Sequence, residues 1–252
     1  MTILQAQDLA INFGGIKAVD GITFDVNKGE IFTIIGPNGA GKTTIFNLIS
    51  RIYQATSGML VFDGDDITRM PPHQIAGRGI ARTFQNVELF EQATLLQNLL
   101  LGQHAHRKTR AWEEMLFLPR VRGAEREIRR RVEEIIDFLD LQHYRDVVVQ
   151  HLPYGVRKVI EVARALCTQP KLILLDEPSS GLNVEETEDL SFWIRDIRDD
   201  LGITVVMVEH DLALVNDVSD RVMAVNYGRL LAIGTPAEVQ NHPDVVKAYL
   251  GG

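Results

Sequence analysis

The sequence is poor in the features that mark secreted, membrane-spanning and nucleic-acid-coating proteins. It has one cysteine, Cys167, which excludes an internal disulfide and a cysteine-based metal site. No apolar run approaches the length of a membrane span, and the first residues lack a cationic region followed by an apolar one. We therefore expect a soluble protein of the reducing cytoplasm, held at a membrane only through another chain.

The chain also lacks an excess of positive charge, because 26 Lys and Arg face 34 Asp and Glu, giving a net charge of −8. This balance argues against generic nucleic-acid binding by the whole surface. No internal repeat or low-complexity tract is present. With 252 residues, of which 45% are hydrophobic, the chain can bury the core of one large domain or of a domain with a lobe. Cys167 follows apolar residues at helical spacing, which predicts a packed core thiol.

One stretch organises the rest of the chain. A short apolar run, Ile31–Ile35, reads as a buried strand, and the spacing of the apolar residues after position 44 predicts a helix. Between them stands a glycine-rich turn whose backbone N–H groups would point inward at the positive end of the helix dipole. The turn and the start of the helix comprise Gly36, Pro37, Asn38, Gly39, Ala40, Gly41, Lys42, Thr43 and Thr44.

This arrangement predicts a site for nucleotide phosphates. The three glycines allow close approach of the backbone, Lys42 can reach the β- and γ-phosphates, and the Thr43 hydroxyl can ligate Mg²⁺. The alternative is a glycine turn that caps a helix beside an exposed lysine. The strand before the turn and the helix after it favour the phosphate site.

Around this stretch the pattern predicts short strands at 3–11, 17–26 and 58–62, separated by glycine turns, and a helix at 72–81 followed by an extended segment at 82–86. Phe13 lies in the first loop, where it either packs on a sheet edge or offers a stacking platform for adenine. From about 92 to 168 the chain reads as helical, with a basic and aromatic insertion at 104–123.

After Pro170 strands and helices alternate again. The pattern predicts strands at 172–175, 204–208, 222–225 and 230–233, and an amphipathic helix at 184–201. The first of these strands ends in Asp176 and Glu177, which are placed to hold Mg²⁺ and to polarise a water in line with the γ-phosphate. The alternative is a solvated acidic turn. His210 follows the next strand and would reach the same crevice, although an isolated histidine is more often a cap or a packed side chain.

The order of these pieces resembles the ATP-binding subunit of ABC transporters over essentially the whole chain. The resemblance implies an α/β fold: a RecA-like P-loop NTPase core with an antiparallel β subdomain at 1–91 and 169–252, and a helical subdomain at 92–168. In the family's terms the matching positions are the adenine-stacking Phe13, the Walker A loop 36–44, the Q-loop residue Gln85, the signature motif 152–156, the Walker B strand 172–177, the D-loop 180–183 and the switch histidine His210.

The resemblance also implies roles for these residues. Glu177, His210, Gln85 and Lys42 would be catalytic, and Thr43, Gln85 and Asp176 would hold Mg²⁺. ATP would lie between the Walker A loop of one subunit and Tyr154 and Gly155 of a second, identical or different. Permease subunits would hold this pair at the cytoplasmic face of the membrane, a solute-binding protein would complete the system, and no nucleic acid would take part.

The segment 82–86, the helical insertion, Leu152–Gly155 and the C-terminal residues resemble the branched-chain amino acid importers, closer to the LivG type than to the LivF type. Related small polar solutes, urea or amide transport and lipid export remain alternatives, because solute specificity would lie in partner chains. The alternative of a P-loop kinase would not explain the signature motif or His210. A nucleic-acid mechanoprotein would need coiled arms or duplicated cassettes, and a non-hydrolysing scaffold would not need Glu177.

Two motifs depart from the family pattern, the signature and the adenine-stacking residue. The signature usually offers a serine and two glycines, where this chain has Pro153, Tyr154 and Gly155. Because proline has neither a hydroxyl nor an N–H, we predict a working but weakened contact with the γ-phosphate, made by Gly155 and the amides of a helix beginning near Val156. Phe13 replaces the more usual tyrosine and keeps the stacking face.

Overall fold

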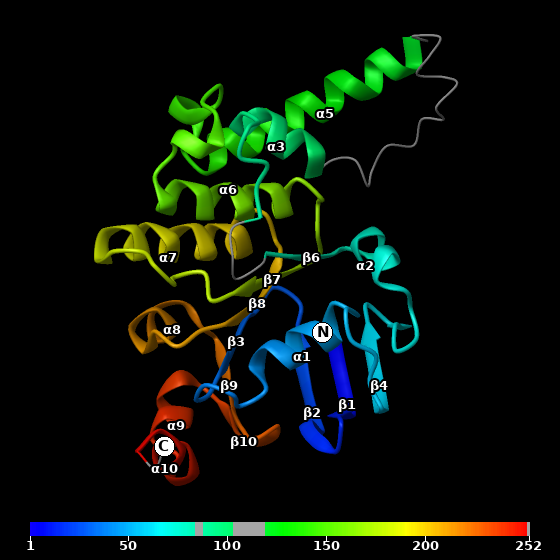
Figure 1. Cartoon of the computed structure of the whole chain (residues 1–252), viewed down its shortest axis with the longest axis vertical. Coiled ribbons are helices and arrows are strands. Elements are labelled where there is room, and N and C mark those ends of the chain that lie inside the picture. The colour runs from blue at the N-terminus through cyan, green and yellow to red at the C-terminus, as the bar shows by residue number, and fades with distance from the viewer. Residues whose placement is uncertain (84–87, 103–118, 251–252) are drawn as a thin grey trace.

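The structure is a computed structural model that describes residues 1–83, 88–102 and 119–250. Figure 1 shows two β-sheets in the lower part of the molecule and a group of helices, α3, α5 and α6, above them. Parallel and antiparallel strands and covering helices together confirm the predicted α/β class. The Q-loop prediction for Gln85, and residues 104–118 of the predicted insertion, lie outside the described residues.

The larger sheet has six strands in the order β10-β9-β3-β8-β7-β6. Its members are β3 (Ile31–Ile35), β6 (Ile80–Arg82), β7 (Leu172–Asp176), β8 (Thr204–Val208), β9 (Arg221–Asn226) and β10 (Arg229–Gly234). All neighbouring strands are parallel except β9 and β10. Every residue of β3, β7 and β8 is buried, which is why these segments read as continuous apolar runs.

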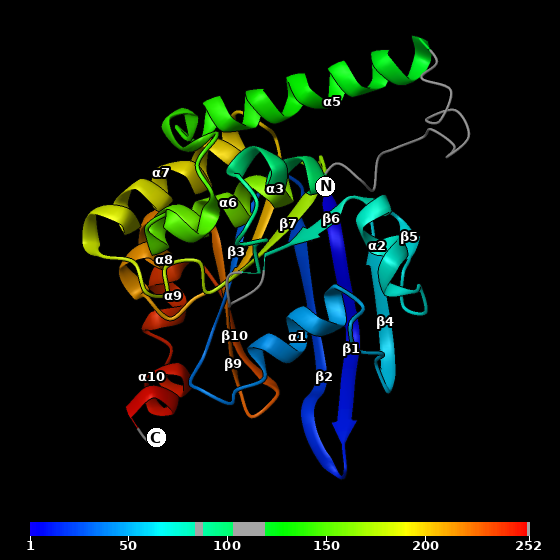
Figure 2. The same cartoon turned by 45° about the horizontal axis from the view of Figure 1, so that its top comes forward.

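The smaller sheet is antiparallel, in the order β2-β1-β4-β5. It contains β1 (Thr2–Phe13), β2 (Ile16–Asn27), β4 (Ser57–Phe62) and β5 (Asp65–Asp66). The helix α1 (Lys42–Ile49) packs its apolar residues into one core with this sheet and with one face of the larger sheet. The helix that follows the phosphate loop is therefore fixed between two sheets, as Figure 2 shows.

The other face of the larger sheet shares one core with a group of helices. They are α3 (Leu95–Gly102), α5 (Pro119–Phe138), α6 (Tyr154–Leu166) and α7 (Val184–Asp199), with 3-10 turns at Gln142–Tyr144 and Val149–His151. The helices α6 and α7 pack on the sheet, and α5 packs on α3 and α6. Cys167 lies in this core at 1% exposure, and burial raises the pKa of its thiol to about 12, which confirms the prediction of a packed thiol. The chain ends with α8 (Leu212–Val218), α9 (Pro236–Gln240) and α10 (Pro243–Leu250).

The helix predicted at 72–81 is too long. The observed helix α2 (Pro72–Arg78) ends at Gly79, whose φ of 102° is the left-handed conformation that terminates helices. Ile80 and Ala81 then pair with β7 as the edge strand β6, which tertiary contacts determine and local pattern does not. Among the described residues, no helix is long and apolar enough to cross a membrane.

Candidate nucleotide site

Three parallel strands bring the predicted site residues to one edge of the larger sheet. Across β3, β8 and β7 the residues Ile34, Val208 and Asp176 stand in register. The segments that follow these strands are the phosphate loop, Glu209-His210 and Glu177, so they leave the sheet side by side. This is the carboxyl edge of an open α/β sheet, where such folds bind their ligands.

The phosphate loop needs its glycines for two separate reasons. A Cβ added to Gly36 would lie 2.2 Å from the Val225 carbonyl oxygen, and one added to Gly41 would lie 2.6 Å from the Ala18 carbonyl oxygen. Gly41 also has a φ of 102° at the N-terminus of α1, where no side chain caps the helix. The first N–H groups of α1 are therefore available to an anion.

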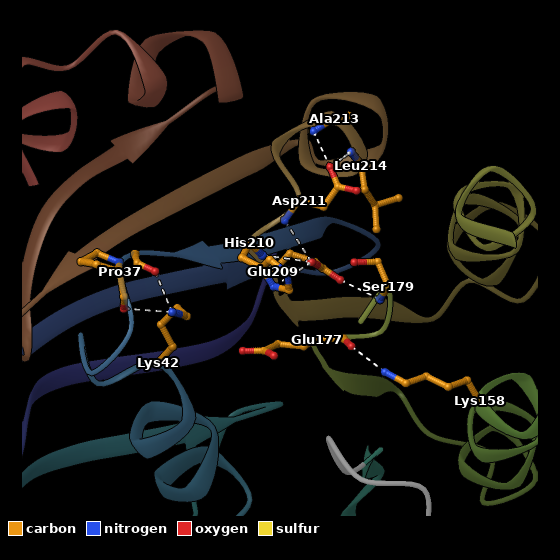
Figure 3. A network of polar contacts seen from close by, with 11 residues as sticks. Pro37, Lys42, Lys158, Glu177, Ser179, Glu209, His210, Asp211, Ala213 and Leu214 are labelled. Atoms are coloured by element: carbon orange, nitrogen blue, oxygen red, sulfur yellow. Dashed lines mark hydrogen bonds and ion pairs between the residues drawn. The ribbon is translucent and has the colours of Figure 1, made fainter. Parts of the chain in front are cut away.

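Lys42 is folded back onto the loop that precedes it. Its Nζ donates to the Gly36 carbonyl at 2.6 Å and to the Pro37 carbonyl at 3.1 Å, as Figure 3 shows. The side chain is buried, and burial lowers the pKa of its ammonium, while the Glu177 and Asp176 carboxylates oppose that shift. Thr43 lies exposed in the first turn of α1, next to Thr44.

Asp176 ends β7 and carries an incompletely bonded carboxylate. Its Oδ2 accepts a hydrogen bond from Arg82 Nη2 at 2.8 Å, and its buried Oδ1 has no hydrogen-bond partner among the described residues. Burial raises the pKa of Asp176, and the Arg82 hydrogen bond opposes the rise. An ionised carboxylate with one open oxygen is a suitable ligand for a small hard cation.

Glu177 follows in a left-handed backbone conformation. Its φ is 47°, a left-handed value that costs a non-glycine residue about 1–3 kcal/mol. Its N–H donates to the Val208 carbonyl at 2.9 Å, and its own carbonyl accepts from Ser180 N–H at 3.1 Å. In Figure 3 the Glu177 carboxylate points toward the side occupied by Lys42 and away from Lys158.

His210 stands exposed at the end of β8 beside a buried carboxylate that organises the surrounding loops. Glu209 Oε1 accepts from Ser179 N–H at 2.8 Å, and Glu209 Oε2 accepts from the backbone N–H of His210 at 2.9 Å and of Asp211 at 3.3 Å. Glu209 is completely buried. It therefore ties the segment after Glu177 to the segment that carries His210, as Figure 3 shows.

The signature segment begins the helix α6. That helix starts at Tyr154, two residues before the predicted start, with Pro153 at its N-cap and no side-chain cap. Tyr154 is exposed, and its ring lies against the D-loop: a Cβ on Gly181 would be 2.8 Å from Tyr154 Cε1. The Gly155 site is buried beside Glu186.

Phe13 is half-exposed, with its ring edge-on to Tyr53 at a centroid distance of 5.2 Å. Phe13 is the last residue of β1, paired with Ile16 of β2, and not a loop residue as the sequence predicts. Its exposed ring is compatible with packing at the sheet edge and with stacking on adenine.

Four residues near the site were not assigned a role from the sequence. Arg82 bonds Asp176, Lys158 bonds the Glu177 carbonyl, and Glu209 bonds three loop amides. Burial raises the pKa of the Tyr249 phenol on α10, and the backbone of Gly36 opposes that rise. Each contact joins residues at least 19 positions apart except the two Glu209 makes with its own neighbours. The only sequence signal was the position of Glu209 directly before His210.

A glycine-rich loop joins the buried strand β3 to a helix, and two carboxylates stand at the end of the parallel strand β7, separated from β3 by β8. This arrangement defines a P-loop nucleoside-triphosphatase. The family model described as ABC transporter matches residues 19–180, and the one described as branched-chain amino acid ATP-binding cassette transporter matches residues 229–252. The chain therefore belongs to the ATP-binding subunits of ABC transporters, and it is an ATPase of that family.

Relatives and solved structures agree with this assignment. The high-affinity branched-chain amino acid transport ATP-binding protein BraF of Pseudomonas aeruginosa is 41% identical, covering 99% of this chain and 98% of its own. The protein LivG of Escherichia coli, with the same description, is 39% identical over the same shares. The crystal structure of the ADP conformation of MJ1267, an ATP-binding cassette of an ABC transporter, aligns with a TM-score of 0.86 at 31% identity, covering both chains completely. The predicted family and fold are confirmed.

Proposed function

We propose that this chain is the ATP-hydrolysing subunit of an ABC importer for branched-chain amino acids. The observation that carries the proposal is the match of residues 229–252 to the branched-chain amino acid family model, because this segment lies outside the general match at 19–180. Two relatives described as branched-chain amino acid transport proteins, BraF and LivG, support it over nearly the full chain.

ATP would lie with its phosphates on the loop 36–44. The open N–H groups of α1 would receive the phosphate oxygens, and the Lys42 ammonium would leave the Gly36 and Pro37 carbonyls to bond the β- and γ-phosphates. Phe13 would stack on the adenine. Breaking the two Lys42 hydrogen bonds to carbonyl oxygens costs little free energy, because charged phosphate oxygens replace these neutral acceptors.

The residues present suit Mg²⁺. The buried Oδ1 of Asp176, which has no hydrogen-bond partner in the described ranges, and the exposed hydroxyl of Thr43 are hard oxygen donors. The ion when bound would neutralise phosphate charge. Gln85 is the third ligand that the family resemblance implies.

Hydrolysis would use Glu177 as the base that accepts a proton from the attacking water. The fixed φ of its backbone and the direction of its carboxylate toward Lys42 support this role. His210 would contact the γ-phosphate from the end of β8, with Glu209 holding its backbone in place.

We infer a pair of ATPase subunits arranged head to tail. The exposed Tyr154 and the N-terminus of α6 would face the ATP held by the other subunit. ATP binding would close the pair of subunits, and hydrolysis would open it. Gln85 would link nucleotide state to permease subunits at the cytoplasmic face of the membrane, and a solute-binding protein would deliver the solute.

Purification in mild detergent of the tagged chain, expressed in its own cells, tests this assignment. The proposal expects co-purification of integral membrane subunits, and loss of leucine, isoleucine and valine uptake when the chain is deleted. Uptake restored by the wild-type chain and not by Lys42→Ala would support it. Unchanged uptake after deletion would contradict it.

A second candidate is lipid export, because the lipopolysaccharide export system ATP-binding protein LptB of Haemophilus influenzae is 35% identical over the whole chain. The same purification separates the two, since a lipid exporter would yield different membrane partners and leave amino-acid uptake intact.

A further inference from the structure

Lys158 is a buried lysine in the second turn of α6. Its side chain is 7% exposed, and its Nζ donates to the Glu177 carbonyl at 2.8 Å (Figure 3). Burial lowers the pKa of the Lys158 ammonium, and the carboxylate of Glu209, followed by those of Glu161, Glu177 and Asp176, opposes that shift. A buried ammonium beside several carboxylates is retained at a cost, so its placement calls for a role.

The bond falls on the strained residue of the site. With a φ of 47°, Glu177 is held at its N–H by Val208 and at its carbonyl by Ser180 N–H and Lys158 Nζ. Val208 lies on the adjacent strand β8 and Ser180 lies in the loop that follows Glu177, whereas Lys158 lies on the helix α6. It approaches the carbonyl while the carboxylate points the opposite way, so it can orient the carboxylate without competing for it.

The same lysine sits one turn along α6 from the signature residues. Positions 154 and 155 precede Lys158 by four and three residues and therefore share its face of the helix. The Lys158 Nζ lies 6.0 Å from the centroid of the Tyr154 ring. A displacement of the start of α6 would therefore reach the Glu177 backbone through a single side chain.

We propose that Lys158 is a positioning residue for Glu177, connecting the signature helix to the carbonyl of the catalytic base so that the position of α6 sets the direction of its carboxylate. This inference rests on the proposed function of Glu177. It assigns to α6 an influence on hydrolysis in its own subunit, in addition to the contact proposed across the pair.

The test compares Lys158→Met and Lys158→Arg in the full-length chain. Methionine keeps the length and removes the donor, so we expect kcat to fall about 10- to 100-fold, while the Kd for ATP stays within about twofold. Arginine keeps a charged donor and should restore most of the rate. Lys171→Met is the control, because that lysine is exposed and pairs with Asp63 at the opposite end of β7 from Asp176.

A double variant separates positioning from a general loss of packing. In Glu177→Gln the base is already absent, so adding Lys158→Met should lower the residual rate by less than about twofold. A full multiplicative loss would overturn the proposal, as would Lys158→Met with wild-type kcat, or a loss of kcat matched by an equal loss of ATP affinity.

The single variant Glu177→Gln distinguishes failure of the Lys158 positioning role from failure of the proposed function. If Glu177→Gln hydrolyses ATP normally, Glu177 is not the base, and the proposed function of Glu177 is wrong. If it is inactive and Lys158→Met is not impaired, only the positioning role fails. Should Lys158→Met not fold, Lys158→Arg and Lys158→Gln decide: both keep a donor, and a loss of kcat above about tenfold in both would contradict the proposal.

Discussion

Arg82 and Asp176 form a buried ion pair, Nη2 to Oδ2 at 2.8 Å, across 94 positions of the sequence. The same guanidinium donates to Asn47 Oδ1 on α1 at 2.6 Å and to Oγ of Ser50, the C-cap of that helix, at 3.0 Å. One side chain thus joins the helix of the phosphate loop to the strand that ends in the metal-binding candidate. The second oxygen of Asp176 accepts no hydrogen bond from the part of the chain that the structure describes.

Replacement of Arg82 by methionine should destabilise the fold strongly. Removing one partner of a buried pair leaves an uncompensated charge, which typically costs about 3–5 kcal/mol in the free energy of unfolding. Urea unfolding monitored by circular dichroism measures the change. Arg78→Met is the matched control, because Arg78 pairs with Asp65 at the surface, and its loss should change stability little. Equal effects of the two substitutions would contradict the role of the buried pair.

Substitution of Gly36 by alanine should disrupt the phosphate loop. The new Cβ would lie 2.2 Å from the Val225 carbonyl oxygen, so the loop must move. We expect a lower melting temperature and weaker ATP binding, measured by differential scanning fluorimetry with and without ATP. Gly64→Ala is the control, since its φ of 86° carries the same kind of strain with no atom within 4 Å. If Gly64→Ala lowers the melting temperature as much, steric contact at Gly36 is not the cause.

Replacement of Lys42 by alanine should weaken ATP binding directly. The ammonium already stands over the loop at Gly36, so its removal deletes a charge-assisted contact to phosphate without deleting a contact to another element. We expect the Kd for ATP to rise about 10-fold or more, which corresponds to the loss of about 1.4 kcal/mol or more. Titration with a fluorescent ATP analogue measures it, and undiminished affinity would argue against the phosphate-loop assignment.

Conversion of Pro153 to serine should raise ATP turnover in the assembled transporter. Pro153 caps α6 without a side-chain hydrogen bond, whereas serine would provide both a helix cap and a hydroxyl toward the opposing γ-phosphate. The prediction requires the complete transporter, because the contact is made across the subunit pair. Turnover that stays the same or falls would show that the proline does not weaken the contact.

The sequence was sufficient for the parts of the site that neighbouring residues build. The strand before Gly36, the helix after Lys42 and the strand ending at Asp176 are all continuous in the chain, so periodicity and glycine placement predicted them. The start of α6 was placed two residues late, because Pro153 acts as its N-cap, and α2 was extended past the left-handed Gly79.

The contacts that organise these parts could not be predicted in the same way. Arg82 meets Asp176 only because β6 adds to the edge of β7, and Lys158 reaches Glu177 only because α6 packs over that strand. A basic residue next to a Thr-Phe-Gln segment, or on an amphipathic helix, has the pattern of a solvated side chain. Tertiary packing buried both of them.

The central claim is that ATP occupies the loop 36–44 with the Glu177 carboxylate activating the water that attacks it. A single-turnover assay of Glu177→Gln with radiolabelled ATP and Mg²⁺ tests this most directly, with bound nucleotide identified after rapid separation. The account predicts wild-type affinity, bound nucleotide that remains ATP, and a hydrolysis rate reduced by at least about 100-fold. Conversion of bound ATP to ADP at the wild-type rate would contradict it.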